Sequence, residues 1–401
     1  MDSLVSRNSI FGTWPLLLGL GVLMLGAGLL SSLLGLRATI EGFPTAVTGA
    51  VMSCYYVGFL AGTVAAPRLV QSVGHVRVFA ALAAVASAAS LVYPIWVHPL
   101  PWAATRLVTG VCLAGIYVVA ESWLNDRASR NNRGRLLALY MVVLYVGLGS
   151  AQFLLTLASP RLPILFMLSS TLTSLAMVPI VLSAHQVPER SVPRKVSYRE
   201  LYRNSPLGVV AVTVSGFVSS ILFSMGPVYA HLSGLDTGGI AQFMAVTILA
   251  GMVSQYPVGR LSDRMDRRTV IALICTLATC VAAAIFFFGA TLQSLLPLAA
   301  LFSGLSLTLY SLALSHVNDK LEHAEMVAAS SSLLLLNGAG AVFGPVLAGS
   351  LIGVFGPRAY FATLGTLTGI LTLYDLWRKA RRKPPEKKRP FSLPEASTRK
   401  P

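Results

Sequence analysis

Residues 259–268 read Gly-Arg-Leu-Ser-Asp-Arg-Met-Asp-Arg-Arg, a short basic hairpin between two long apolar runs. A weaker copy begins at Arg68, 192 positions before Arg260, and it also lies between apolar runs. A second pair of similar segments starts at Tyr117 and Tyr310, at an offset of 193. Two repeats at nearly the same offset indicate a duplicated chain whose halves meet near position 195.

The composition of the chain places these apolar runs in a membrane. Of the 401 residues, 55% are hydrophobic and 11% are charged, and the mean hydropathy is +0.70. Soluble domains carry about 25% charged residues. The runs are about 20 residues long, which is the length that crosses a bilayer, and they lack the alternation of barrel strands. The sequence therefore predicts an all-α membrane protein.

The predicted architecture is twelve transmembrane helices in two pseudo-symmetric six-helix bundles. An N-terminal bundle covers 1–184 and a C-terminal bundle covers 207–377. Between them, 185–206 forms a cytoplasmic linker, and 378–401 is a basic tail that we expect to be disordered because it is rich in charge and proline. In membrane proteins, paired halves are typical of transporters with a site at their interface. The twelve spans are expected at 13–36, 46–66, 77–97, 102–122, 137–158, 163–184, 207–228, 238–258, 269–290, 294–316, 327–352 and 359–377.

The basic residues predict the orientation of the chain. With both termini in the cytoplasm, 27 of the 31 Lys and Arg residues lie in cytoplasmic segments, and only Arg37, Arg161 and Arg358 lie outside. Lys and Arg gather on the cytoplasmic side of membrane proteins, so we expect a multi-pass membrane protein with both termini in the cytoplasm. The net charge of +16 then indicates contact with anionic lipid and not nucleic-acid binding.

The fourth span carries a polar stripe that is expected to line a substrate cavity. Arg106, Gly110, Tyr117 and Glu121 fall within about 60° of one another on a helical wheel. A charge inside a span is costly and usually faces a cavity or a partner. We expect Arg106 to bind an anionic substrate group, to pair with another polar side chain, or to extend to the outer interface. Glu121 either joins a gating pair with Arg127 or an arginine of the basic hairpin, or carries a coupled proton.

Two further spans carry milder polar stripes. Span 7 presents Ser215 and Ser219 on one face, and span 10 presents Ser303, Ser306 and Tyr310 on one face. Small polar residues also serve helix packing, so each serine alone fits either role. Together with the fourth span they predict a mildly polar cavity that is poor in acid. Such a cavity suits a neutral, anionic or amphipathic small molecule.

Other classes of site find no support in the sequence. The chain has no G-x-x-x-x-G-K-[ST] loop, so ATP-driven pumping is not expected. The six histidines do not cluster at metal-ligand spacing, and the four cysteines lie inside spans as packing residues. Because no acids, bases or metal ligands gather at one depth, we expect no enzyme, no cofactor and no metal.

The twelve spans and the repeated hairpin resemble the major facilitator superfamily (MFS). The segment 259–268 is similar to the signature loop of that family, G-x-L-x-D-R-x-G-R-R, and departs from it at Asp266, where glycine is usual. The resemblance implies the MFS fold. It also implies alternating access around a central cavity lined by spans 1, 4, 7 and 10.

Three shorter motifs extend the resemblance. Arg106 and Gly110 resemble the span-4 motif of the family, and Gly-x-x-x-Gly-Pro at 340–345 resembles a motif that antiporters carry in span 5. The run Ala-Glu-Ser-Trp-Leu-Asn at 120–125 is similar to a bacterial subgroup, the YcaD-like transporters.

The basic hairpin is expected to form a conformational gate. A carboxylate at its position can rest against the positive N-terminal end of a neighbouring helix. Its arginines can pair with carboxylates of the other half and so hold the cytoplasmic side shut in one state. The alternative is that these charges only direct insertion and make weak surface pairs. The residues assigned to the gate are Gly259, Asp263, Arg264, Arg267 and Arg268.

The sequence and the resemblance thus predict a secondary active transporter of a bacterial inner membrane that moves a small organic solute. The expected coupling ion is H⁺, which rests on the family resemblance and on Glu121. One alternative is efflux of amphipathic or toxic compounds, and another is a non-transporting membrane sensor or scaffold. The intact hairpin argues against the scaffold, because a scaffold needs no gate. We expect a monomer in contact with membrane lipid.

Overall fold

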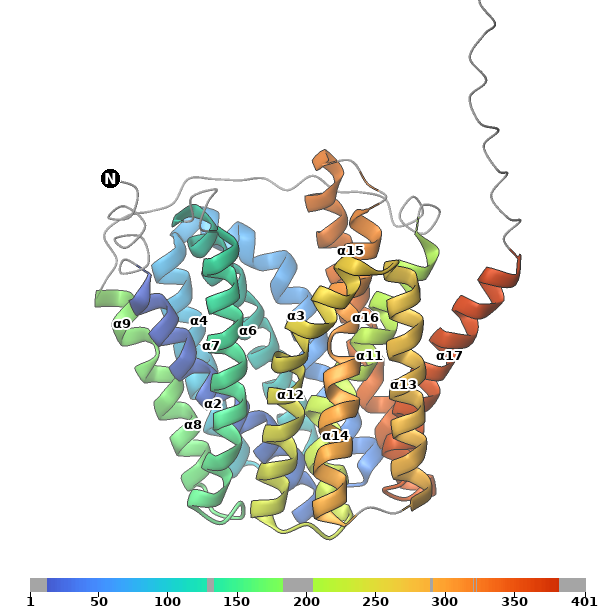
Figure 1. Ribbon diagram of the computed structural model, residues 1–401. Coiled ribbons are helices and arrows are strands. Elements are labelled where there is room, and N and C mark those ends of the chain that lie inside the picture. Colours follow the sequence, from blue (N-terminus) through green and yellow to red (C-terminus); the bar gives the residue numbers. More distant parts are fainter. Residues whose placement is uncertain are drawn as a thin grey trace, which may run out of the picture.

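The computed structural model describes residues 13–127, 133–182, 205–288, 291–319, 321 and 323–381. Within these ranges every regular element is a helix (Figure 1). Most of the predicted linker and the predicted tail beyond Arg381 lie outside the described residues. The last helix continues to Arg381, so the first residues of the predicted tail are helical.

The first half of the chain forms six membrane-length helical segments, some of them interrupted. Its elements are α2 (Trp14–Ile40), α3 (Thr45–Val73), α4 (His75–Ser90), α5 (Val92–Ile95), α6 (Pro99–Arg127), α7 (Arg133–Ala151), the 3₁₀ helix η1 (Gln152–Leu157), α8 (Ile164–Leu175) and α9 (Met177–Leu182).

The second half repeats this order. Its elements are α11 (Pro206–Leu232), α12 (Thr237–Arg264), α13 (Arg267–Phe288), α14 (Leu292–Ser306), α15 (Leu309–Asn318), α16 (His323–Phe355) and α17 (Ala359–Arg381).

The twelve predicted spans all coincide with these helices. Among the described residues, eleven segments are long and apolar enough to cross a membrane. The twelfth, α17, has 23 residues, or about 35 Å at 1.5 Å per residue, which also suffices. It is less apolar than the others because it carries several threonines and Asp375.

The two halves repeat the same helix pairings. The contacts of α2 with α7, α3 with α6 and α4 with α8 recur as α11 with α16, α12 with α14 and α13 with α17. The halves meet mainly where α3 packs on α16, α2 on α11 and α7 on α12. This repetition is what the duplicated sequence segments predict.

The bundle has two distinct ends. Helix α2 begins and α17 finishes at one end, which we call the terminal end (top of Figure 1). The opposite end, which we call the far end, carries the turns at Gly42, Gly234 and Gly356. These glycines have φ between 76° and 86°, a region that other residues rarely adopt. They let each helix stop and the chain turn back.

Asp266 closes the turn that precedes α13. Its carboxylate accepts hydrogen bonds from the backbone N and the hydroxyl of Thr269, both at 3.1 Å. This is the N-cap arrangement that stabilises a helix start. The residue that departs from the family loop therefore has a local role, which is to begin α13.

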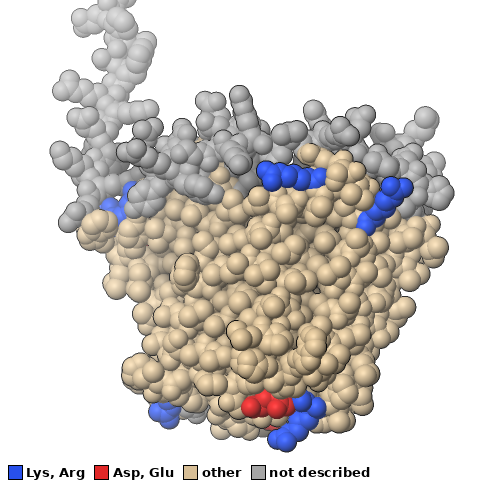
Figure 2. All heavy atoms as spheres, turned by 180° about the vertical axis from the view of Figure 1, so that it is seen from behind, with Lys and Arg blue, Asp and Glu red and all other residues tan. Residues whose placement is uncertain are grey.

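The surface between the two ends is suited to lipid. On the face shown in Figure 2, Lys, Arg, Asp and Glu lie at the two ends and are missing from the surface between them. Large apolar side chains are exposed on the helices, such as Phe287 (74%), Phe343 (62%) and Leu373 (66%). In water such a surface would be unfavourable, whereas in a bilayer it is solvated by hydrocarbon.

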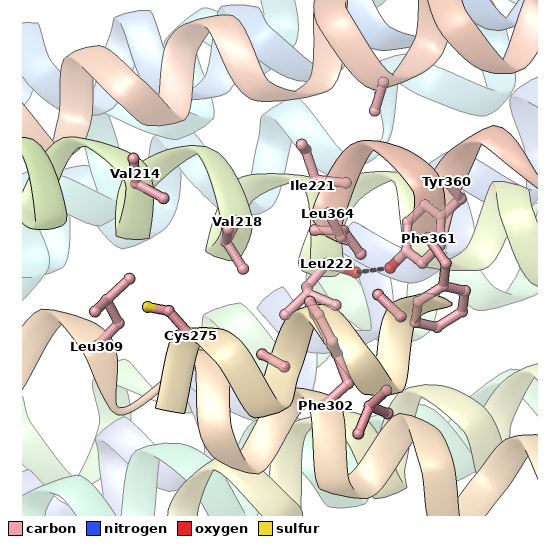
Figure 3. Packing of buried hydrophobic residues seen from close by; sticks show 14 of the residues in the cluster. Val214, Val218, Ile221, Leu222, Cys275, Phe302, Leu309, Tyr360, Phe361 and Leu364 are labelled. Atoms are coloured by element: carbon pink, nitrogen blue, oxygen red, sulfur yellow. Dashed lines mark hydrogen bonds between the residues drawn. The ribbon is translucent and has the colours of Figure 1, made fainter. Parts of the chain in front are cut away.

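Each half has its own apolar core. In the second half, Phe302 and Phe361 pack edge to face with ring centroids 5.8 Å apart (Figure 3). The hydroxyl of the buried Tyr360 donates to the carbonyl oxygen of Leu222 at 3.5 Å. Because its polar atom is satisfied, Tyr360 can lie deep in the core. These cores let each half behave as one packed unit.

Candidate functional site: a central cavity between the halves

A cavity of about 350 Å³ lies between the two halves. The first half lines it with residues of α2, α3, α4, α6, α7, η1 and α8, and the second half with residues of α11, α12 and α16. Spans 1, 4 and 7 thus contribute as the family resemblance implies. Span 10 contributes none of the described lining residues, and α3 and α16 contribute in its place.

The structure brings only part of the predicted cavity set together. Arg106, Tyr117 and Ser219 line the cavity. The other five predicted residues are not among the described lining residues, and they are Glu121, Ser215, Ser303, Ser306 and Tyr310. Ser303 and Ser306 are buried inside the second half; the Ser303 hydroxyl donates to the Ala299 carbonyl at 2.7 Å.

Arg106 is buried in the cavity wall without a carboxylate partner. Its side chain lies seven residues into α6, about 10 Å from the start of the helix at 1.5 Å per residue. The residue is 4% exposed. Its Nη2 lies 3.0 Å from the sulfur of Met52, its guanidinium carbon lies 5.0 Å from the centroid of the Tyr55 ring, and its Nε has no partner.

This environment does not neutralise the charge of Arg106. A cation over an aromatic ring gains about 0.5–2 kcal/mol, whereas burying an unpaired ion costs several kcal/mol. The described lining residues include no Asp and no Glu. Arg106 also does not extend to the outer interface, since it lines the cavity. The arrangement can therefore bind an anionic group that enters the cavity.

Close packing of α3 on α6 places Tyr55 beside Arg106. A Cβ added at Gly110 would meet the carbonyl oxygen of Tyr55, and one added at Gly58 would meet the backbone of Leu107. Only glycine lets the two backbones approach so closely. Gly110, which the helical wheel placed in the polar stripe, thus serves to bring the two helices together.

Aromatic rings continue the first-half wall from Arg106. The ring centroids of Tyr55 and Phe59 lie 6.1 Å apart, and those of Phe59 and Tyr117 lie 6.0 Å apart. Phe223 of α11 lines the cavity from the other half. The sequence analysis missed Tyr55 and Phe59, although their spacing of four residues on span 2 predicts one helix face.

The second half contributes Asn337 to the cavity. Its Nδ2 donates to the carbonyl oxygen of Val212 at 3.1 Å and to the hydroxyl of Ser215 at 3.0 Å. Ser215, predicted to line the cavity, instead helps to tie α11 to α16. The sequence analysis also missed Asn337, which could have been found as a lone amide inside the apolar run of span 11.

Glu121 lies at the terminal end of the Arg106 stripe. Its side chain is exposed, and the hydroxyl of Tyr140 donates to its Oε1 at 3.4 Å. No ion pair among the described side chains involves Glu121. The side chain of Arg127, one predicted partner, lies outside the described residues.

The arginines of the basic hairpin pair within the second half. Arg267 Nη1 lies 2.8 Å from Asp319 Oδ1, and Arg268 Nε lies 2.5 Å from Asp375 Oδ1. Among the described side chains, neither arginine pairs with a carboxylate of the first half. Asp263 and Arg264 are exposed and take part in none of the ion pairs of the described residues.

At the far end, the two halves are in direct contact. The hydroxyl of Thr45 in α3 donates to the carbonyl oxygen of Gly349 in α16 at 2.8 Å. A Cβ added at Gly49 would meet the carbonyl of Pro345, and one added at Gly35 would lie 3.2 Å from the carbonyl oxygen of Ser224. Backbone contacts of this kind close the far end of the bundle.

Comparison with known proteins agrees with this architecture. The sequence family described as Major Facilitator Superfamily matches residues 16–330 and 253–400. The chain is 30% identical over 335 residues to YcaD, an uncharacterised MFS-type transporter of Escherichia coli, and the match covers 83% of this chain and 87% of YcaD.

Solved structures of transporters share the fold. The nucleoside transporter NupG matches with a TM-score of 0.78 at 12% identity, over 93% of this chain and 100% of NupG. A bacterial homologue of the human lysosomal transporter Spinster, in an inward-facing conformation, matches with a TM-score of 0.72 at 13% identity, over 93% and 95% of the two chains. The family match and the identity to YcaD show that the chain belongs to the Major Facilitator Superfamily and is a secondary transporter.

Proposed function

We propose that this transporter carries a small organic anion whose charged group binds Arg106. The observation that supports the proposal is that Arg106 is 4% exposed, lines the cavity and has no carboxylate partner among the described residues. A bound anion would supply the missing charge in a site of low dielectric, where the attraction is strong. The mostly apolar wall favours a substrate with an apolar body.

The two six-helix bundles, 1–184 and 207–377, are then the halves that move relative to each other. Because Lys and Arg concentrate on the cytoplasmic side, the terminal end is the cytoplasmic end in this proposal. The direct contacts at the far end and the exposure of Glu121 then correspond to an inward-facing state. The hairpin residues Asp263 and Arg264 would engage the first half only when the cytoplasmic side closes.

Glu121 is the proposed carrier of the coupled proton. It follows the Arg106 stripe towards the terminal end, and it is exposed there with one hydrogen bond, from Tyr140. A carboxylate at this place can take up or release a proton on the cytoplasmic side. Movement of an anion together with a proton would be electrically neutral, so the membrane potential would not oppose it.

The test of the anion site is transport by Arg106 variants in proteoliposomes. We expect Arg106→Gln to weaken anion binding by about tenfold or more, because losing one partner of a buried charge pair costs about 2–5 kcal/mol. Arg106→Lys should restore part of the affinity, because it keeps the charge and loses the planar fork. Counterflow of a panel of radiolabelled carboxylates measures both effects.

The matched control is Arg161→Gln, which removes an arginine of the far end that does not line the cavity. Equal affinity of Arg106→Gln and the parent protein for every carboxylate would contradict the anion site. Absence of exchange with all solutes in the parent protein would contradict transport itself.

A further inference from the structure

The second-half wall of the cavity offers hydrogen-bond acceptors and no free donors among its described residues. Its polar side chains are Ser219 and Asn337, and the rest of its lining is apolar or glycine. The hydroxyl of Ser219 donates to the carbonyl oxygen of Gly216 at 3.3 Å. A carbonyl can only accept, so the hydrogen of Ser219 is used and its lone pairs remain.

The side-chain amide of Asn337 likewise has no free hydrogen to donate. Both hydrogens of its Nδ2 are used, one on the carbonyl oxygen of Val212 and one on the hydroxyl of Ser215. The Val212 contact also assigns the amide orientation, since only the nitrogen can donate to a carbonyl. What Asn337 can still offer to a ligand is its Oδ1, which is an acceptor.

The free donors lie on the first-half wall. Arg106 has an unpartnered Nε. Ser31 and Tyr55 also line the cavity, and their hydroxyls donate to no partner among the described residues. Other first-half hydroxyls already donate within their own helices. The hydroxyl of Thr63 donates to the carbonyl oxygen of Phe59 at 2.9 Å, and the hydroxyl of Thr109 donates to the carbonyl oxygen of Arg106 at 3.0 Å. The two walls therefore differ: the first-half wall holds a cation and free donors together with acceptors, whereas the polar side chains of the second-half wall offer acceptors alone.

From this polarity we infer that the substrate is an aromatic carboxylate whose ring carries a hydroxyl or amino group. The inference rests on the proposed anion site at Arg106. The carboxylate binds Arg106 in the first half, and the ring hydroxyl or amine donates to Ser219 and Asn337 in the second half. Between these points the ring lies against the aromatic wall, where stacking is favourable. Such a molecule contacts both halves at once, so its binding favours the state in which they enclose it.

The experiment compares ligands that differ only at the donor. Binding to the purified full-length protein in lipid nanodiscs is measured by calorimetry for phenylacetate, its 3- and 4-hydroxy derivatives and its 4-methoxy derivative. A methoxy group keeps the oxygen and removes the hydrogen. We expect one hydroxy isomer to bind at least tenfold more tightly than both phenylacetate and the methoxy compound.

Protein variants test which side chains receive the donor. Ser219→Ala should reduce the preference for the hydroxy compound over phenylacetate several-fold. Ser220→Ala is the matched control, because Ser220 is the next residue, donates to the carbonyl of Phe217 at 3.0 Å and does not line the cavity. Asn337→Leu should reduce the preference for the hydroxy compound further. If that variant does not fold, the ligand series on the parent protein still tests the inference.

The outcomes separate this inference from the proposed function. Equal binding of all the acids, abolished by Arg106→Gln, would overturn the donor inference and leave the anion site in place. Equal binding of 2-(4-hydroxyphenyl)ethanol and 4-hydroxyphenylacetate would overturn the anion site. Binding of none of the aromatic acids would overturn the substrate class.

Discussion

Burial of the charged side chain of Arg106 lowers the stability of the protein, and the position of Arg106 in the cavity explains why this residue is present. A buried cation over Tyr55 with an unpartnered Nε destabilises the empty protein relative to an apolar residue. In the proposed function a bound anion offsets this cost. Glu121, on the same helix, has the opposite environment, since it is exposed and hydrogen-bonded to Tyr140. The two charges are separated along α6, so the proposal can assign substrate binding to one and proton exchange with water to the other.

Replacement of Glu121 by Gln tests its role as the proton carrier. We expect E121Q to lose uphill uptake driven by a pH gradient and to retain counterflow, because the amide cannot carry a proton while the cavity is unchanged. Uptake and counterflow in proteoliposomes, with and without an imposed gradient, measure the difference. The matched control is Glu41→Gln at the far end, where Glu41 pairs with Arg37 at 2.7 Å. Gradient-driven uptake at the parent rate in E121Q would exclude Glu121 as the carrier.

At the scale of helices, the basic hairpin anchors α13 inside the second half. Asp266 caps the helix start, Arg267 reaches α15 through Asp319 and Ser315, and Arg268 reaches α17 through Asp375. These contacts hold three helices of one bundle together at the terminal end. Two of the predicted gate residues, Arg267 and Arg268, thus stabilise one half in this conformation. Such contacts within a half are needed if that half is to move as a rigid unit.

The two ion pairs of α13 should differ strongly in their effect on stability. The Asp375 side chain is 1% exposed and that of Asp319 is 52% exposed. Removing one partner of a buried pair costs about 3–5 kcal/mol, whereas an exposed pair contributes about 0–1 kcal/mol. We therefore expect Asp375→Asn to lower the midpoint of thermal unfolding in detergent far more than Asp319→Asn. Equal midpoints for the two variants would contradict the buried pair.

At the scale of the whole molecule, transport depends on contacts that the two halves make only in one state. The far end is closed by backbone approach of α3 to α16 and of α2 to α11. These contacts rely on close backbone approach at glycines, and they have to separate if the far end is to open. Alternating access requires this separation when the cavity opens to the other side.

A cross-link at the far end should stop transport by preventing this separation. In a background without native cysteines, Thr45→Cys and Gly353→Cys place two thiols in contact, because a Cβ at Gly353 would lie 2.9 Å from the hydroxyl oxygen of Thr45. We expect oxidation to abolish exchange in proteoliposomes and a reducing agent to restore it.

The control pair for the cross-link lies inside one half. Thr279→Cys and Thr368→Cys join α13 to α17, since the hydroxyl oxygens of Thr279 and Thr368 lie 2.8 Å apart. This disulfide should leave transport active, because the two helices move together. Full transport with the far-end cross-link formed would mean that the far end need not open.

Part of the site could be read from the sequence because helix periodicity is local information. The stripe of Arg106 and Tyr117 and the position of Ser219 need only an angle of 100° per residue, and all three line the cavity. The predictions for Ser303 and Ser306 rested on the same angle. They lie away from the cavity because the packing of α14 turns their face into the second-half core, and a helical wheel cannot indicate which neighbour a face meets.

The sequence by itself determined the membrane location, the twelve helices and the duplication, because hydropathy, helix length and repeats are properties of the chain alone. Only the tertiary structure decided which faces meet. It brought Tyr55 and Asn337, from helices with no charged residue near either position, into the cavity of Arg106, and it directed Arg267 and Arg268 to carboxylates of their own half. Such pairings depend on how closely backbones approach at residues such as Gly110, and that distance emerges only when the helices pack.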